Sequence, residues 1–287
     1  MIMKRVSLLI KAICCFAAMW AAAPLSAQDG GMGLWSSIGL EKDLPKGMNA
    51  GCEAEYRLCD GLSATDRWSI GASLSKRLYR NAAKTFSVRA ELGYKFINAV
   101  RPEETKFKSD GFSIEDVLYD YNILSEYWQN RHRLSAALSA SYELGRFKFS
   151  VKERYQYTYE SESECGREKH RFELDEEKLE NQGIVEAREM PVEKDIKTNA
   201  ADSKQVLRSR LQASYNIPHW KYDPFVSYEL FNGLDSGFDL RKMRVNAGVD
   251  FSFNKKHYFK LSYLWQDNSD DDEPAGAAVC IGYTFSF

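Results

Sequence analysis

The segment from Arg146 to Glu160, RFKFSVKERYQYTYE, constrains the fold more than any other part of the chain. Its odd positions are apolar or aromatic except for Glu153, and its even positions are polar. A period of two residues predicts a β-strand with one apolar and one polar face. Strands of soluble sandwiches are commonly about five or six residues long. This run is roughly twice that length and closes in tyrosines, which is typical of a membrane-spanning strand that ends in an aromatic belt.

The same alternation recurs along most of the chain. The expected strands lie at 34–41, 50–58, 67–74, 86–96, 131–143, 146–160, 207–217, 226–230, 242–253, 259–266 and 279–287. This pattern gives about eleven strands, whereas bacterial single-chain barrels have an even number. We therefore expect either that the weak 34–41 segment does not span, leaving about ten, or that a long loop hides one more, giving about twelve. The predicted fold is all-β: a single transmembrane, antiparallel, up-and-down β-barrel of about ten to twelve strands.

The connections alternate between short turns, as at Gly145, and long polar stretches. Transmembrane barrels have short periplasmic turns and long extracellular loops. We expect long surface loops at about 98–130, with a short helix near 114–127, and at 161–204, which is dense in charge and predicted to be mobile.

Aromatic residues are expected to form two interfacial belts. The belt at the loop ends comprises Trp68, Trp128, Tyr157, Tyr159 and Trp265, and the belt at the turn ends comprises Tyr142, Phe147, Tyr215, Phe253, Phe259, Phe285 and Phe287.

The N-terminus reads as a secretory signal over residues 1–27, with Lys4 and Arg5 before an apolar core and small residues at its end. A cytoplasmic protein with a buried N-terminal helix is the alternative. The mature barrel is then 28–287. Its net charge of −2 says nothing about a nucleic-acid partner, and none is expected because the sequence has no basic-aromatic patch that would bind nucleic acid. A mean hydropathy of −0.48 does not exclude a barrel, because every second residue faces a polar lumen.

The pieces RHRLSAALSASYELGRFKFSVKERYQYTY, LRSRLQASYNI, PFVSYELF and VCIGYTFSF carry a family resemblance. From about Trp35 to Phe287 the chain resembles the uncharacterised outer-membrane barrel family called domain of unknown function 2490. The resemblance implies an outer-membrane β-barrel of a Gram-negative cell, with lipid around it and no established activity or catalytic residue. The terminal Phe287 also resembles the signal that the barrel-insertion machinery reads.

Charged residues on the polar face predict the lining of the lumen. The candidate lumen residues are Arg89, Glu91, Arg131, Arg133, Lys152, Arg154, Arg208, Arg210, Glu229, Arg244 and Asp250. These charges can neutralise one another in cross-strand pairs, and a positive surplus can select anions; the two interpretations are not exclusive. The predicted function is a narrow, porin-like channel or binding barrel for small, anionic solutes. The alternative is a plugged barrel with a structural or surface-interaction role.

An enzyme that modifies lipid is the competing class, and we expect the protein not to be one. That chemistry needs a nucleophile beside a base, and Ser135, three residues from His132, falls on the opposite face. No catalytic, cofactor or metal site is predicted. The acidic run 267–273 is expected to be a solvated loop, with calcium binding as the alternative. Cys59 and Cys165 either pair or remain free thiols.

Overall fold

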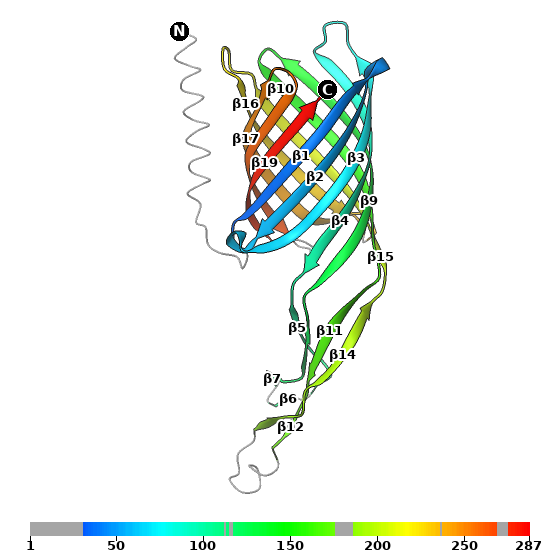
Figure 1. Cartoon of the computed structure of the whole chain (residues 1–287), viewed down its shortest axis with the longest axis vertical. Helices are drawn as coiled ribbons and strands as arrows, with labels where there is room; N and C mark the ends of the chain where they lie inside the picture. Colours follow the sequence, from blue (N-terminus) through cyan, green and yellow to red (C-terminus); the bar gives the residue numbers. More distant parts are fainter. Residues whose placement is uncertain (1–30, 112, 115–116, 176–185, 236, 269–274) are drawn as a thin grey trace.

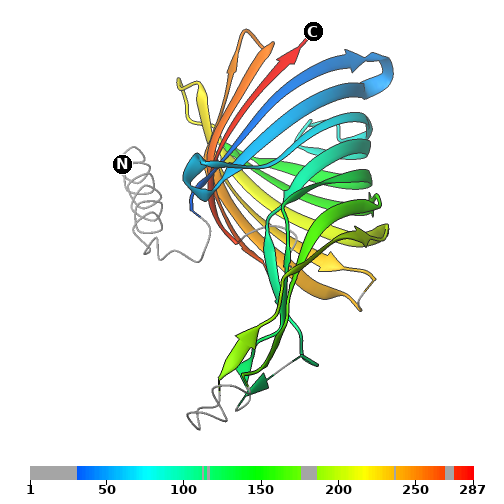
Figure 2. The same cartoon turned by 60° about the horizontal axis from the view of Figure 1, so that its bottom comes forward.

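The computed structural model describes residues 31–287, except 112, 115–116, 176–185, 236 and 269–274. The expected signal at 1–27 and most of the acidic run at 267–273 lie outside these residues. The described part of the chain forms a closed barrel of eleven strands, and a narrow sheet extends from one end of it (Figures 1 and 2). No helix among the described residues has the length and apolar character of a membrane span.

Eleven strands form the barrel wall. They are β1 (Gly33–Leu44), β2 (Met48–Cys59), β3 (Ala64–Arg80), β4 (Phe86–Arg101), β9 (Tyr127–Leu144), β10 (Phe147–Glu160), β15 (Asp202–Tyr215), β16 (Tyr222–Gly233), β17 (Asp239–Phe253), β18 (His257–Asn268) and β19 (Gly276–Ser286). Single turns of 3-10 helix, η1 (Pro45–Gly47) and η2 (Asp60–Leu62), join β1 to β2 and β2 to β3. The Gly145 turn joins β9 to β10 as predicted, with Gly145 in the left-handed region at φ 62°.

The barrel closes through a parallel pair. Ten of the eleven neighbouring pairs are antiparallel, while β1 lies parallel to β19, with Gly33 opposite Ala278 and Glu41 opposite Ser286. An up-and-down meander with an odd number of strands begins and ends in the same direction, so its closure has to be parallel. Eleven strands confirm the predicted range of about ten to twelve, but neither adjustment to an even number holds: the weak 34–41 segment is part of the wall, and no further strand of the described residues enters it. The wholly antiparallel prediction fails at this one seam.

The alternation places apolar side chains outside and polar side chains inside. Large apolar residues such as Leu92, Leu134 and Ile281 are exposed on the outer face. Polar residues on the inner face, among them Ser69 and Gln129, are buried. A soluble sandwich buries its apolar face instead, so the arrangement is that of a transmembrane barrel.

Aromatic girdles flank the apolar outer face at both ends. Trp68, Trp128 and Tyr159 are exposed near the loop end, and Tyr142 and Phe253 are exposed near the turn end. The last residue belongs to the second girdle: the Phe287 N–H donates to the carbonyl oxygen of Glu41 at 3.0 Å, and Lys42 Nζ lies 5.1 Å from the ring.

Glu153 lies on the outer face of β10, where an ionised carboxylate is costly. Such a carboxylate calls for a bulge in the strand, a proton or a partner. The β10–β15 ladder runs without a break, and the Ser209 hydroxyl, directly opposite, donates to Glu153 Oε2 at 2.6 Å. The structure thus supplies a partner.

Two of the long loops build a separate four-stranded sheet, the protruding sheet, which extends beyond the ends of β4, β9, β10 and β15 (Figure 1). Its strands, in spatial order, are β14 (Glu193–Asn199), β11 (Ser163–His170), β8 (Tyr121–Leu124) and β5 (Glu104–Phe107). Short ladders accompany it: β6 (Ser113–Ile114) with β7 (Val117–Leu118), and β12 (Phe172–Leu174) with β13 (Ala187–Glu189).

The protruding sheet corrects two expectations. The region near 114–127 contains strands β7 and β8 where a short helix was predicted, and more than half of the predicted loop at 161–204 forms strands. Arg167 and Lys169 on β11 reach Asp195 on β14, at 2.5 and 2.9 Å. Hydrogen bonds from Arg167 and then Lys169 hold the pKa of Asp195 well below its ordinary value. A hydrogen bond from Lys194 lowers the pKa of Glu168 in the same way.

Candidate functional site: the charged lumen

The lumen contains a cavity of about 420 Å³, which we call the middle cavity. This volume is in the range of pockets that hold small molecules. Nine basic and five acidic side chains line it: Arg57, Arg67, Lys95, Arg133, Arg154, Arg208, Arg210, Arg244 and Lys260, with Glu41, Glu53, Glu55, Glu91 and Glu229. The lining therefore carries a positive surplus even if every carboxylate is ionised.

Glu229 is the centre of an ion-pair cluster in the lumen. Its carboxylate lies 2.7 Å from Arg208 Nη2, 3.4 Å from Arg210 Nε and 3.6 Å from Arg244 Nη1. The four residues come from adjacent strands β15, β16 and β17, whose register places Glu229 opposite both Arg210 and Arg244. Only 5% of the Glu229 side chain is exposed. One carboxylate thus serves three guanidinium groups.

A second ion-pair cluster is centred on Glu91 of β4, whose carboxylate pairs with two residues of β10. Lys152 Nζ lies 2.6 Å from Glu91 Oε2, and Arg154 Nη2 lies 3.0 Å from Oε1. β9 separates β4 from β10 in the sheet, and its residues Ala137 and Ser139, which lie opposite Glu91 and Lys152, are small. Small residues on β9 therefore let the long side chains meet over it.

A smaller cavity of about 90 Å³ lies nearer the protruding sheet, and we call it the loop-end cavity. Eight basic residues line it, namely Arg57, Arg131, Arg133, Lys204, Arg208, Arg241, Lys242 and Arg244, with Glu160 as its acidic residue. Glu160 pairs with Arg131 and with Arg101, both at 3.2 Å. Arg133 Nε donates to the Thr158 hydroxyl at 2.9 Å.

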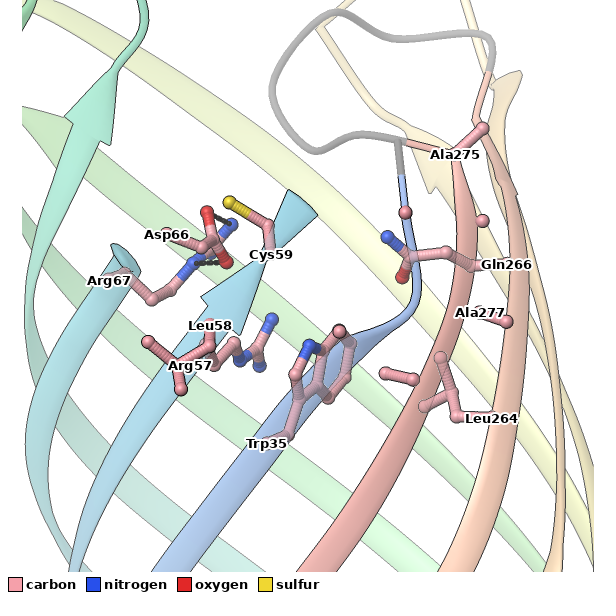
Figure 3. A pocket seen from close by; sticks show the side chains of 14 residues that line it. Trp35, Arg57, Leu58, Cys59, Asp66, Arg67, Leu264, Gln266, Ala275 and Ala277 are labelled. Carbon is pink, nitrogen blue, oxygen red and sulfur yellow. Dashed lines mark hydrogen bonds and ion pairs between the residues drawn. The ribbon is translucent and has the colours of Figure 1, made fainter. Parts of the chain in front are cut away.

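Aromatic rings inside the barrel hold several of these cations. The Arg57 guanidinium carbon lies 3.6 Å from the centre of the Trp35 ring, and the two side chains are stacked beside a pocket of about 30 Å³ (Figure 3). In the same view Arg67 donates to Asp66 at 3.0 Å. Phe231 lies 4.8 to 5.1 Å from the charged groups of Arg208, Lys242 and Arg244.

Sequence reasoning missed Trp35 and Phe231 as lumen residues because it expected aromatic side chains in the outer belts. The signal was present. Trp35 alternates with Leu34 and Ser36, and Phe231 shares its face with Ser227 and Glu229. The lumen face of β4 likewise ends in apolar residues, Ile97 and Ala99, which are buried. Whether a side chain faces the lumen or the outside is decided by its odd or even position along the strand, and not by its residue type.

The structure brings most of the predicted lumen residues together. Glu91, Arg154, Arg210 and Glu229 line the middle cavity, Arg131 lines the loop-end cavity, and Arg133, Arg208 and Arg244 line both. The remaining three line neither: Arg89 donates to the Ser75 hydroxyl at 3.0 Å, Lys152 pairs with Glu91, and Asp250 lies opposite Lys260 in the β17–β18 register.

Other candidate chemistry is dispersed. The His132 ring bonds the Tyr94 hydroxyl at 2.8 Å, whereas Ser135 lines the middle cavity, so the two do not form a nucleophile–base pair. The four cysteines of the described residues are free thiols, Cys59 and Cys165 among them. The described ranges contain no group of three His, Cys, Asp or Glu side chains arranged to hold a metal ion.

The closed wall, the apolar outer face and the charged lumen define an outer-membrane-type β-barrel. The chain belongs to the family described as "Protein of unknown function (DUF2490)", whose model matches residues 32–275. This confirms the family resemblance seen in the sequence.

Searches with the sequence and with the fold add two observations. No curated protein matches the chain. Among solved structures, the β domain of the Bordetella autotransporter BrkA is 12% identical, with a TM-score of 0.46, over 90% of this chain and 99% of that one. The translocator domain of the autotransporter NalP from Neisseria meningitidis is 6% identical, with a TM-score of 0.26, over 92% of each chain.

Proposed function

We propose that the protein is a narrow barrel of a Gram-negative outer membrane that binds and passes small anionic solutes. The supporting observation is the positive surplus of the middle cavity, nine basic against five acidic lining residues. Basic rings select anions in pores because they replace part of the hydration of the ion and repel cations. Enzymatic activity is not part of the proposal.

The proposal includes two partners besides the solute. Lipid covers the apolar outer face, and the barrel-insertion machinery recognises the terminal strand through Phe287, whose side chain is exposed at the end of β19. A protein with this outer face needs a bilayer or detergent to stay in solution as a monomer.

Ion selectivity in planar bilayers tests the function. The purified protein should conduct above leak, and its reversal potential in a KCl gradient should show anions crossing faster than cations. Arg154→Gln removes one charge from the middle cavity and should shift the reversal potential toward zero. Lys106→Gln, an equal change on the exposed β5, should leave it unchanged. Absence of conductance, or selectivity for cations, would contradict the proposal.

A plugged barrel with a surface-interaction role is the second candidate, and the protruding sheet favours it. The sheet ends in two edge strands, β5 and β14, with exposed Phe107 and Ile196. Edge strands can pair with a strand of another chain. This candidate predicts that the wild-type protein does not conduct, and that replacing residues 162–201 with a short Gly-Ser turn abolishes a cell-surface interaction but leaves barrel insertion intact.

A further inference from the structure

β14 is an edge strand of the protruding sheet, since among the described strands only β11 pairs with it. Its side chains alternate between the two faces of the sheet: one face carries Glu193, Asp195, Lys197 and Asn199, and the other carries Lys194, Ile196 and Thr198. Ile196 is 69% exposed, and its neighbour on β11 is Gly166, which has no side chain to cover it. The N–H and C=O groups on the outer side of such an edge are open to another strand.

The sequence of β14 is complementary to itself. A second copy of β14 that adds to this edge in antiparallel orientation, about a two-fold axis perpendicular to the sheet, makes every contact twice. With Ile196 opposite Ile196 of the copy, Asp195 faces Lys197 of the copy and Lys197 faces Asp195 of the copy. Opposite charges that face each other across two strands stabilise the pair.

The registers on either side of this one are unfavourable. A two-fold pair shifts only in steps of two residues, because a shift of one would bring residues of opposite faces together. A shift of two residues in one direction places Asp195 opposite Asp195, and a shift of two in the other direction places Lys197 opposite Lys197. Like charges directly opposite each other destabilise a pair. The charges of β14 therefore favour the register centred on Ile196.

Both charged residues have room for this contact. Lys197 has no ion-pair partner among the described residues. The Asp195 carboxylate, which bonds Arg167 and Lys169 of its own sheet, keeps 34% of its side chain exposed and can accept a further cation. Charged residues on edge strands usually prevent pairing with other chains. On β14 they oppose the neighbouring registers and favour one, so they act as a means of selecting the partner.

Antiparallel pairing requires the two copies to lie in different membranes. β14 leads into wall strand β15, so its chain runs toward the barrel, and the sheet extends along the long axis of the molecule (Figure 1). Two copies in one membrane both direct β14 toward that membrane, which makes the two strands parallel. An antiparallel pair instead places the two barrels at opposite ends of the joined sheet.

We propose that β14 is a docking strand for β14 of a second copy of this chain in a facing membrane, and that the protein joins two outer membranes in this way. The inference names the partner of the surface-interaction candidate, rests on a barrel whose protruding sheet lies outside the cell, and does not depend on conduction. A strand of seven residues makes a small contact, so the contact holds where many copies face one another, and at low density β14 stays open to water.

β5, the other edge strand, is a poorer partner for β14. It has four residues, and Glu104 lies in the same row of the sheet as Asp195. Pairing β5 with β14 of a neighbour at the same height would place these two carboxylates opposite each other, where they repel. β5 therefore provides the matched control.

Vesicle clustering tests the pairing. The full chain is reconstituted into two populations of phosphatidylcholine vesicles, one biotinylated and one fluorescent, and the fluorescence captured on streptavidin beads is measured. Capture should require the protein in both populations. Lys197→Glu places a carboxylate opposite Asp195 of the copy and should lower capture by at least about tenfold, because the loss at each contact multiplies over many copies. Lys106→Glu, the same charge reversal on β5, should leave capture unchanged.

Cross-linking between the two vesicle populations tests the register. In a chain whose other cysteines are alanine, Ile196→Cys should give a disulfide-linked dimer on mild oxidation, because directly opposite residues have Cβ atoms about 4.5–5.5 Å apart. Lys194→Cys vesicles mixed with Thr198→Cys vesicles should also give a dimer. Lys194→Cys alone should not, since the two copies of that position lie apart along the strands.

Each of three clustering results would overturn the pairing: no capture of wild-type vesicles, capture of protein-free vesicles, or equal capture of the wild type and Lys197→Glu. Amide hydrogen exchange verifies that β11 and β14 of Lys197→Glu are as protected as in the wild type. Dimers of Ile196→Cys that form within one vesicle population without clustering would place both copies in one membrane and overturn the geometry.

Conductance of the same preparations separates this inference from the channel. Anion-selective conduction without clustering would support the channel and overturn the pairing. Clustering without conduction would support the pairing and overturn the channel. Lys197→Glu should conduct like the wild type, because β14 lies outside the barrel wall.

Discussion

The barrel wall and the protruding sheet are both antiparallel over most of their strands, yet their side chains are distributed differently. Wall strands present apolar residues to the outside and charge to the inside. In the protruding sheet, β11 and β14 carry charged residues throughout, with Glu168, Lys194 and Glu193 among them. We infer that the difference follows from the surrounding medium: a wall in lipid would need one apolar face, whereas a sheet surrounded by water would tolerate polar residues on both faces.

Ion pairs contribute differently in the two regions. In the lumen, Glu229 is almost inaccessible and joins three arginines. On the protruding sheet, pairs such as Lys194 with Glu168 are largely exposed. Removing one partner of a buried pair leaves uncompensated charge, whereas exposed pairs contribute little.

The largest expected effect is the loss of Glu229. Glu229→Gln leaves Arg208, Arg210 and Arg244 facing one another without their shared carboxylate, and we expect a loss of roughly 3 to 5 kcal/mol in the free energy of unfolding. Urea titration of the vesicle-inserted protein measures it. Glu193→Gln on the protruding sheet is the matched control, and little change is expected because that side chain is 72% exposed. Equal effects of the two substitutions would mean that the lumen cluster is as well solvated as the surface.

A lipid-facing charge should give the next largest effect. Leu92 is 63% exposed on the outer face of β4, and Leu92→Arg should destabilise the inserted barrel by about 2 to 4 kcal/mol. Ile196 on β14 is 69% exposed, and Ile196→Arg should change stability by no more than about 0.5 kcal/mol. The same urea titration compares them. If Leu92→Arg were as harmless as Ile196→Arg, water and not lipid would cover the wall.

The smallest effect is a pH dependence confined to the protruding sheet. The pKa of Asp195 is lowered by Arg167 and Lys169, so its contribution to stability is complete above the ordinary aspartate pKa of about 3.9 and is lost as the pH falls below that value. Amide hydrogen exchange, corrected for the intrinsic rate, should show β11 and β14 losing protection from about pH 4 downward while β9 and β10 remain protected.

Asp195→Asn provides the control for this pH effect. The variant should show weakened protection of β11 and β14 already at pH 7, with a flatter pH profile. A wild-type sheet that keeps its protection down to pH 2 would show that these exposed ion pairs do not hold it together.

The same comparison explains what the sequence could predict. Strands with an apolar face, such as β10 and β17, were located because one apolar and one polar face require an alternation of residue types that is visible in the sequence. β11 and β14 lack that face, and their pairing depends on contacts such as Arg167 with Asp195 between distant segments. From the sequence alone, a charge-rich stretch of this kind is predicted to be a loop. The parallel seam was also missed, although a count of eleven strands requires it.

The candidate site was predictable in part for the same reason. The alternation along each strand identified Arg133, Arg208 and Glu229 as lumen residues. It could not show that the lumen residues line two cavities, or that Arg57 lies over the Trp35 ring. Those features depend on the distance across the barrel, which is set by strand number and tilt.

The central claim is that lipid covers the barrel wall and water covers the protruding sheet, and spin-label accessibility in vesicles tests it most directly. Leu92→Cys and Ile196→Cys would be labelled in a background in which Cys52, Cys59, Cys165 and Cys280 are alanine. The account predicts that the label at 92 is relaxed mainly by oxygen, which concentrates in lipid, and the label at 196 mainly by a water-soluble nickel chelate. A label at 92 that responds to the nickel chelate as strongly as the label at 196 would contradict it.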